Sequence, residues 1–174
     1  MKSSELSIRR LHPDDATDYR ALRLRGLREH PDAFTSSYEE AVEMPFAATV
    51  ERLKPEGPDA VYGAFRDGKL CGVVGLARES RMKNRHKASV FGMYVAPEHL
   101  RRGVGSALLR HLVNEAKQQP GLAQLVLTVT ATNIAATALY EAFGFTSFGI
   151  EPRAIRVDDA YFDKNHMILF LAER

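Results

Sequence analysis

The amino-acid sequence predicts a single α+β domain, and three observations support this fold class. The length of 174 residues and the hydrophobic content of 45% suit one ordinary globular core. The first half contains short strands joined by tight turns, as at Asp67-Gly68. The second half alternates strand, helix and strand, a pattern typical of helices packed on a mixed sheet. We therefore expect one domain over residues 1–174, with antiparallel strands early and a strand–helix–strand core after them.

The first half begins with a strand over 6–10 and a helix from about Pro13 to Glu29. Proline at the first helical position, followed by acidic residues, favours this start. Residues 32–40 form a polar segment in which Phe34 is embedded. The remaining expected elements of this half are a helix over 45–53, a loop over 55–58, and strands over 61–65, 69–78 and 88–95.

The second half begins with a helix from Gly103 that Pro120-Gly121 ends. Its apolar residues recur every four positions, at Val104, Leu108, Leu112 and Ala116. The apolar strand expected over 122–130 is predicted to be buried on both faces. The last expected elements are a helix over 133–143 closed by Gly144, strands over 145–150 and 167–171, and a turn at 158–161.

The most informative segment, residues 90–109, reads as an apolar strand, a basic turn and an amphipathic helix. The turn carries Gly103 and Gly105, which allow close approach of an anion to the backbone. The first N–H groups of a helix lack internal partners and carry the positive end of its dipole. Arg101 and Arg102 add positive charge and forked donors. The segment therefore predicts a seat for a phosphate-bearing cofactor.

Two familiar phosphate loops do not fit this segment. The string Gly-x-x-x-x-Gly-Lys-Ser/Thr is absent, and Leu108 stands where a dinucleotide fingerprint needs its third glycine. The next strand also lacks a terminal acid for a ribose, which disfavours a nucleotide-dependent oxidoreductase. From these residues alone, a plain strand–turn–helix unit whose glycines only shape the turn is equally supported.

Two segments resemble the GNAT superfamily of acyl-CoA-dependent N-acetyltransferases. In that family a strand ends near Val-x-Pro and Gln/Arg-x-x-Gly-x-Gly/Ala opens a helix, and residues 94–97 and 103–109 are similar. Leu100 departs from the pattern, because the family has Gln or Arg there. Residues 132–145 resemble the family's Asn-x-x-Ala-x-x-Leu-Tyr-x-x-x-Gly-Phe pattern. The resemblance is firm over about 69–150 and looser over the first sixty residues.

This resemblance implies a mostly antiparallel sheet of about seven strands flanked by about four helices, with the fourth and fifth strands splayed. It implies acetyl-CoA as cosubstrate, no metal, and direct attack of an amine on the thioester. The backbone N–H of Val95 is the expected donor to the thioester oxygen, and Tyr140 is the expected general acid. The expected coenzyme-binding residues are Met93, Val95, Arg101, Arg102, Gly103, Val104, Gly105, Ser106, Asn133 and Tyr140.

Spacing and chemistry bear on Tyr140 in two ways. Asn133 and Tyr140 lie seven residues apart, close to two helical turns, so both side chains share a face. A phenol with a pKa near 10 stays protonated at neutral pH and can donate to a thiolate. From spacing alone, Tyr140 is instead a core residue beside Phe143 and Asn133 is an N-cap. The family resemblance reverses that preference.

The general base and the amine acceptor stay open. Glu39, Glu40, Glu79, His86 and a chain of water molecules are all candidates for the base. The residues expected near the acceptor, by position only, are Phe34, Ser37, Tyr38 and Tyr161. Antibiotics, polyamines, amino acids and protein N-termini all remain open as acceptors, as do longer acyl groups.

Composition limits the other function classes. A net charge of +2 implies no nucleic-acid surface. The single cysteine, Cys71, lies in an apolar run and is expected to be inert, and it fits a reducing cytoplasm. Residues 1–5 carry no apolar signal region, and no segment is long enough to cross a membrane. The expected function is N-acetyl transfer to a small-molecule or peptide amine; a non-catalytic acyl-CoA sensor is the alternative, and a homodimer is left open.

Overall fold

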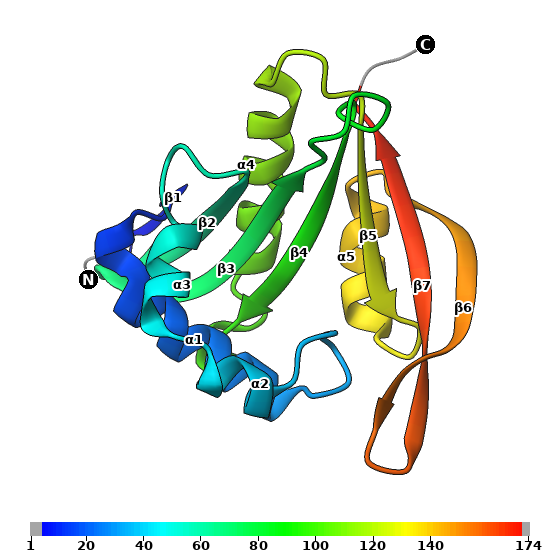
Figure 1. The fold of residues 1–174 in the computed structure, drawn as a ribbon, viewed down its shortest axis with the longest axis horizontal. Coiled ribbons are helices and arrows are strands. Elements are labelled where there is room, and N and C mark those ends of the chain that lie inside the picture. Colours follow the sequence, from blue (N-terminus) through cyan, green and yellow to red (C-terminus); the bar gives the residue numbers. More distant parts are fainter. Residues whose placement is uncertain (1–4, 172–174) are drawn as a thin grey trace.

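The structure, a computed structural model, describes residues 5–171, so the signal-region expectation for the first residues falls largely outside the described part. It contains one seven-stranded sheet in the order β1-β2-β3-β4-β5-β7-β6 (Figure 1). Neighbouring strands are antiparallel except for the parallel pair β4–β5. The strands are β1 (Leu6–Arg10), β2 (Asp59–Arg66), β3 (Lys69–Arg78), β4 (Lys87–Val95), β5 (Gln124–Thr130), β6 (Thr146–Val157) and β7 (Ala160–Phe170).

Five α-helices and two 3₁₀ turns flank this sheet in the described part of the chain. They are η1 (Pro13–Asp15), α1 (Ala16–Glu29), α2 (Tyr38–Glu43), α3 (Phe46–Arg52), η2 (Pro97–His99), α4 (Val104–Gln118) and α5 (Ile134–Ala142). The predicted α+β class is confirmed. None of the helices within residues 5–171 has the length and apolar character needed to span a membrane.

The helix α2 lies in a segment that the sequence analysis described only as polar. Its N-terminus is a capping box, in which Glu40 N donates to Ser37 Oγ at 3.1 Å and Ser37 N donates to Glu40 Oε2 at 3.2 Å. Ser37 and Glu40 are spaced as Ser-x-x-Glu, a known start signal for helices. The spacing could therefore have identified this helix.

The last two strands are much longer than predicted. They form one long hairpin, β6–β7, that extends beyond the rest of the sheet in Figure 1. Residues 146–153 of β6 are exposed. Because backbone pairing rather than burial holds this arm together, hydrophobic patterning revealed only one end of each strand.

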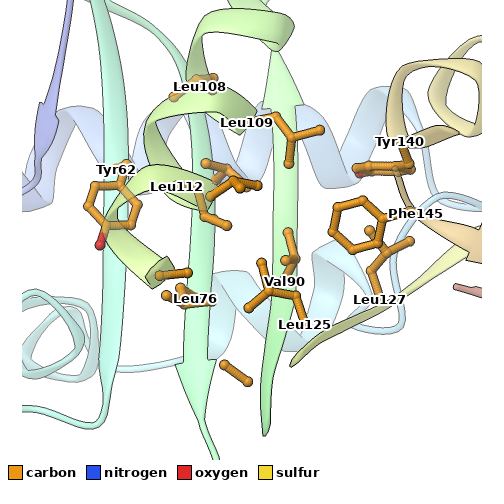
Figure 2. Packing of buried hydrophobic residues seen from close by; sticks show 14 of the residues in the cluster. Tyr62, Leu76, Val90, Leu108, Leu109, Leu112, Leu125, Leu127, Tyr140 and Phe145 are labelled. Atoms are coloured by element: carbon orange, nitrogen blue, oxygen red, sulfur yellow. The ribbon is translucent and has the colours of Figure 1, made fainter. Parts of the chain in front are cut away.

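Two hydrophobic clusters fill the two faces of the sheet. One cluster packs α4 and α5 on the sheet, and in it Leu108, Leu109 and Leu112 are fully buried (Figure 2). Each buried leucine contributes about 1.5–3 kcal/mol. The other cluster packs α1 and its neighbours against β2, β3 and β4. The predicted four-residue apolar repeat of α4 is confirmed, because all four of its members are buried.

The prediction that the fifth strand is buried on both faces is wrong. Leu125, Leu127 and Val129 are buried, whereas Thr128 is exposed and Val126 is only half-buried. Helix α5 covers one face of β5, but the cluster under α1 on the opposite face contains no residue of β5. The second face of β5 is therefore open at Thr128 and is closed only at Thr130, at the end of the strand.

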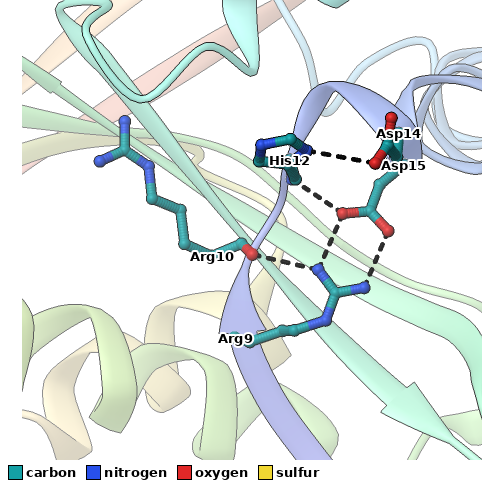
Figure 3. Close-up of polar contacts among 5 residues, drawn as sticks. All are labelled: Arg9, Arg10, His12, Asp14 and Asp15. Carbon is teal, nitrogen blue, oxygen red and sulfur yellow. Dashed lines mark hydrogen bonds and ion pairs between the residues drawn. The ribbon is translucent and has the colours of Figure 1, made fainter.

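An ion pair fixes the start of the first helix against the first strand. Both terminal nitrogens of Arg9 donate to the carboxylate of Asp15 at 2.8 Å, and His12 N donates to the same carboxylate at 2.8 Å (Figure 3). The bond from Arg9 lowers the pKa of Asp15. This anchor joins β1 to the turn that leads into α1.

Candidate functional site

The sheet opens between β4 and β5. These strands pair over only three residues, Lys87–Ser89 with Gln124–Val126, and Figure 1 shows them diverging beyond that point. Residues 90–95 of β4 therefore have no strand neighbour on this side. The splay that the resemblance implies is confirmed.

The backbone N–H of Val95 points into this gap. Ala96 N donates to Cys71 O on β3 at 2.9 Å, and Val95 lies opposite Gly72. Successive amides point to opposite sides of an extended strand, so the Val95 N–H faces away from β3. A bulge at Gly92, with φ of 61°, interrupts the pairing with β3 just before this point. The end of β4 thus presents backbone groups to the gap.

The start of α4 is a row of backbone amides without acceptors. Ala107 N donates to Gly103 O at 3.0 Å, but no amide of residues 101–106 has an acceptor within residues 5–171. Gly103 and Arg101 have φ values of 75° and 58°, so the chain turns sharply before the helix begins. Arg101 and Arg102 are exposed. This arrangement fits an anion, because the amides and the helix dipole favour negative charge.

Gly105 is where α4, α5 and β4 meet. A Cβ at this position would lie 3.3 Å from Leu139 Cδ2 on α5 and 3.5 Å from Met93 Cε on β4. The contact with Leu139 Cδ2 would be tight, whereas the one with Met93 Cε would be an ordinary van der Waals contact, so only a larger side chain would displace both neighbours. Glycine therefore lets the amide row lie beside the open edge of β4.

Tyr140 is buried in the core, with 7% of its surface exposed. Its ring packs edge-on against Phe145 at a centroid distance of 5.9 Å (Figure 2), so its aromatic partner is Phe145 rather than the expected Phe143. Its hydroxyl has no hydrogen-bond partner in the described part of the chain. Burial raises the pKa of Tyr140 to about 12. The ring of Tyr140 can therefore pack in the core while its hydroxyl stays free to donate a proton.

Asn133 is the N-cap of α5. Its Oδ1 accepts a hydrogen bond from Ala136 N at 3.1 Å. The capping interpretation is confirmed, and a contact of Asn133 with a coenzyme stays a prediction.

A network that the sequence analysis missed ties α1 to β4. Tyr94 Oη donates to Glu29 Oε2 at 2.6 Å, and Arg25 donates to both oxygens of Glu98 at 2.7 and 2.9 Å and to Glu29 at 2.8 Å. The bonds from Arg25 to Glu98 lower the pKa of Glu98 to about 2. The ring of Tyr94 is buried. No local pattern reveals this network, because its longest links join residues 65 and 73 positions apart.

The structure separates the candidate bases from one another. Glu79 N donates to Lys87 O at the start of β4, roughly 25 Å along the strand from Val95. His86 lies in the same turn, next to Lys87. Glu39 and Glu40 lie on α2, and Glu40 is engaged with Ser37. Glu79 and His86 are therefore too far from Val95 to receive a proton directly from an amine there.

A buried lysine holds the loop after α1 against the open face of β5 and β7. Lys164 Nζ on β7 donates to Asp32 O at 3.3 Å, Ala33 O at 3.2 Å and Thr130 Oγ1 at 2.9 Å. Thr130 Oγ1 in turn donates to Asp32 O at 2.6 Å. Burial lowers the pKa of Lys164. This loop and α1–α3 form one wall of the gap, opposite the face that carries α4 and α5.

The four residues expected near the acceptor have separate roles. Phe34 stacks under the guanidinium of Arg23, and Ser37 caps α2. Tyr38 receives a hydrogen bond from Arg28. Tyr161 lies at the tip of the β6–β7 hairpin under arginine side chains. Phe34 and Ser37 lie in the loop between α1 and α2, which Lys164 holds at Asp32 and Ala33.

Cys71 is buried, and burial raises the pKa of its thiol. A raised pKa disfavours the thiolate, which is the reactive form. Within residues 5–171, no group of three or more His, Cys, Asp or Glu side chains is arranged to hold a metal ion.

Comparison with curated proteins gives partial matches. The chain is 48% identical over 59 residues to the [ribosomal protein bS18]-alanine N-acetyltransferase of Escherichia coli K12, covering 34% of this chain and 39% of that protein. It is 36% identical over 101 residues to the N-alpha-acetyltransferase RimI of Mycobacterium tuberculosis, covering 57% and 61%. The matched stretches thus span less than two thirds of either relative.

Solved structures match over nearly the whole chain. An acetyltransferase of the GNAT family from Streptococcus pneumoniae superposes with a TM-score of 0.88 at 26% identity, covering 97% of this chain and all of that one. The ribosomal-protein-S18-alanine N-acetyltransferase of Escherichia coli superposes with a TM-score of 0.73 at 24% identity, covering 98% and 96%, and shows the shared fold alone.

The family comparison agrees with the splayed strands and the amide row. The model of the acetyltransferase (GNAT) family matches residues 24–145, which is more than half of the chain. The chain belongs to the GNAT acetyltransferase family.

Proposed function

We propose that this chain transfers an acetyl group from acetyl-CoA to a primary amine by direct attack. The observation that carries the proposal is the row of amides at residues 101–106 that lacks acceptors and lies beside the open edge of β4. A diphosphate and an extended amide-bearing arm fit these two features. The family membership agrees with this reading.

Each part of the chain has a distinct role in this proposal. The amides of Arg101 to Ser106 hold the diphosphate, and the exposed side chains of Arg101 and Arg102 add charge. The backbone of Met93 and Val95 pairs with the pantetheine arm, and Asn133 and Tyr140 lie alongside it. The coenzyme supplies an acetyl group activated as a thioester.

Val95 and Tyr140 carry the chemistry. The N–H of Val95 donates to the thioester oxygen as negative charge develops there. The amine nitrogen forms a bond to the acyl carbon while the bond from that carbon to sulfur breaks. Tyr140 donates its proton to the departing sulfur, and water takes the proton that the amine loses. Since Tyr140 is buried and its pKa is raised to about 12, it is protonated at neutral pH.

We propose a peptide α-amine or a small amine as the acceptor, and the cytoplasm as the compartment. The names of the relatives refer to an alanine of a ribosomal protein and to N-alpha-acetylation, which makes short peptides the first acceptors to test. We treat the chain as one domain, because a single sheet runs through it.

Two measurements on the full chain test the proposal. Isothermal titration calorimetry with coenzyme A should give a 1:1 binding isotherm. Release of free thiol from acetyl-CoA should then depend on an added amine. Absence of binding heat at saturating coenzyme would remove the basis of the proposal.

The alternative is an acyl-CoA sensor without catalysis. A sensor would bind the coenzyme but release no thiol with any amine. The unused hydroxyl of Tyr140 favours the enzyme, since binding alone does not require a buried proton donor.

A further inference from the structure

Arg23 on α1 has a guanidinium nitrogen that the protein leaves unsatisfied. Its Nη1 atom is buried and has no hydrogen-bond partner within residues 5–171. The group stacks on Phe34, with Arg23 Cζ 4.8 Å from the ring centroid. The face of the Phe34 ring attracts the positive charge of Arg23 but offers no acceptor for the hydrogen bonds of its guanidinium group. Arg23 as a whole is half-buried, and an unpaired cation that is partly removed from water is costly, so its donors are expected to meet a ligand.

This nitrogen lies at the edge of the proposed acyl site. A Cβ built on Gly92, the bulge residue of β4, would be 3.7 Å from Arg23 Nη1. Gly92 precedes Val95 by three residues, or roughly 10 Å along an extended strand. A group held by Arg23 would therefore sit several bonds away from an amine at Val95.

Arg23 also lines a cavity of about 310 Å³ between α1, α2 and α3. Arg20, Arg23 and Arg52 all line it. Arg20 donates to Val42 O at 2.9 Å, and Arg52 pairs with Asp59 at 3.7 Å. Of these three cations, Arg23 is the one without a hydrogen bond or ion pair within residues 5–171.

The single carboxylate of the cavity does not neutralise Arg23. Glu40 accepts hydrogen bonds from the N–H and the hydroxyl of Ser37, at 3.2 and 3.1 Å. Burial lowers the pKa of Arg23, and the charge of Arg52 lowers it further. One unpaired cation in a small cavity matches one negative charge of planar, forked geometry, which is a carboxylate.

We propose that the acceptor is an amine that also carries a carboxylate, and that Arg23 binds this carboxylate in the cavity between α1, α2 and α3. This inference rests on the proposed acetyl transfer and names its substrate class. Arg23 is a specificity-determining residue here and takes no part in proton transfer.

Matched acceptors test the inference. The first pair is 5-aminopentanoate and its primary amide. The second pair is the dipeptides Ala-Glu and Ala-Gln, both with an amidated C-terminus. Within each pair, only the acid carries a negative charge. The wild-type chain should prefer the acid of at least one pair by about tenfold in kcat/KM, as expected for a charge-assisted hydrogen bond. Arg23→Gln should bring that ratio close to one.

Two further variants control for charge and folding. Arg110→Gln removes the same charge from an exposed position on α4 and should keep the preference. Arg23→Lys keeps the positive charge without the forked donors and should keep part of the preference for the acid. If one Arg23 variant folds poorly, which a lowered thermal midpoint would show, the other variant decides the test. A preference unchanged in both Arg23 variants, or no preference for an acid in the wild type, overturns the inference.

A binding measurement separates this inference from the proposed function. Calorimetry with the N-acetyl forms of the two dipeptides should show tighter binding of the acidic one to the wild type and not to Arg23→Gln. Equal rates and equal binding for acid and neutral partners overturn the carboxylate inference while acetyl transfer stands. Absence of thiol release from every acceptor refutes acetyl transfer, and the calorimetric comparison still decides the role of Arg23.

Discussion

The two sides of the gap between β4 and β5 are built differently. On the side of α4, the site consists of backbone amides at residues 101–106 and the edge of β4, set by nearby glycines. On the side of α1, it consists of side chains joined over long distances, such as Lys164 to Asp32 and Tyr94 to Glu29. A backbone site tolerates changes of side chain, whereas a side-chain site depends on each partner. We therefore expect the α4 side (the backbone wall) and the α1 side (the side-chain wall) to respond differently to substitution.

The largest expected effect is a fall in kcat in the variant Tyr140→Phe. Removing the proton donor should lower kcat by about 100-fold, the usual range for general acid catalysis. The dissociation constant of coenzyme A should change by less than about threefold, because in the proposed reaction the hydroxyl donates to sulfur as the thioester bond breaks and not in the ground state. Steady-state kinetics and calorimetry measure the two effects. Unchanged turnover, where chemistry limits the rate, would remove Tyr140 from the mechanism.

The second effect concerns the side-chain wall. Lys164→Met removes the donor to the carbonyls of Asp32 and Ala33, so the free energy of unfolding should fall by about 1–3 kcal/mol. KM for the acceptor should rise while the dissociation constant of coenzyme A stays the same. Lys117→Met, at an exposed position on α4, is the matched control. Equal weakening of coenzyme and acceptor binding would contradict the division into two walls.

The third effect concerns the backbone wall. Gly103 has φ of 75°, and a Cβ there would meet nothing within 4 Å, so only its conformation resists substitution. Gly103→Val should cost about 1–2 kcal/mol and weaken coenzyme A binding by about tenfold. Gly103→Asn should be milder, because asparagine adopts left-handed angles more readily. Calorimetry compares the two variants, and equal weakening would argue against a conformational requirement.

The smallest effect is a change in pH dependence. The pKa of Tyr140 is raised to about 12 in the folded chain and is near 10 when unfolded. The stability from the protonated hydroxyl is complete below pH 10 and is lost as pH rises toward 12. Between pH 10 and 11 the wild type should lose about 1 kcal/mol more than Tyr140→Phe. Urea unfolding at each pH measures this, and parallel curves would show that the hydroxyl is not desolvated.

The backbone wall could be predicted from the sequence, and the side-chain wall could not. The first strand, the long α4 and the glycine turn follow from local patterns, and β1 and β3 have the predicted bounds. Arg23 and Lys164 gave no local signal, because the residues that enclose them, such as Phe34 around Arg23 and Asp32 around Lys164, lie elsewhere in the chain. The open face of β5 was also missed, since an apolar run does not reveal which face a neighbouring helix covers.

The link from Lys164 to Asp32 has a consequence for synthesis, because it spans 132 residues. A nascent chain emerges from its N-terminus, so the loop at Asp32 leaves the ribosome long before the last strand exists. Until that strand is made, nothing supplies the ammonium group that fixes the loop. The loop at Asp32 therefore reaches its final form only after β7 has been synthesised.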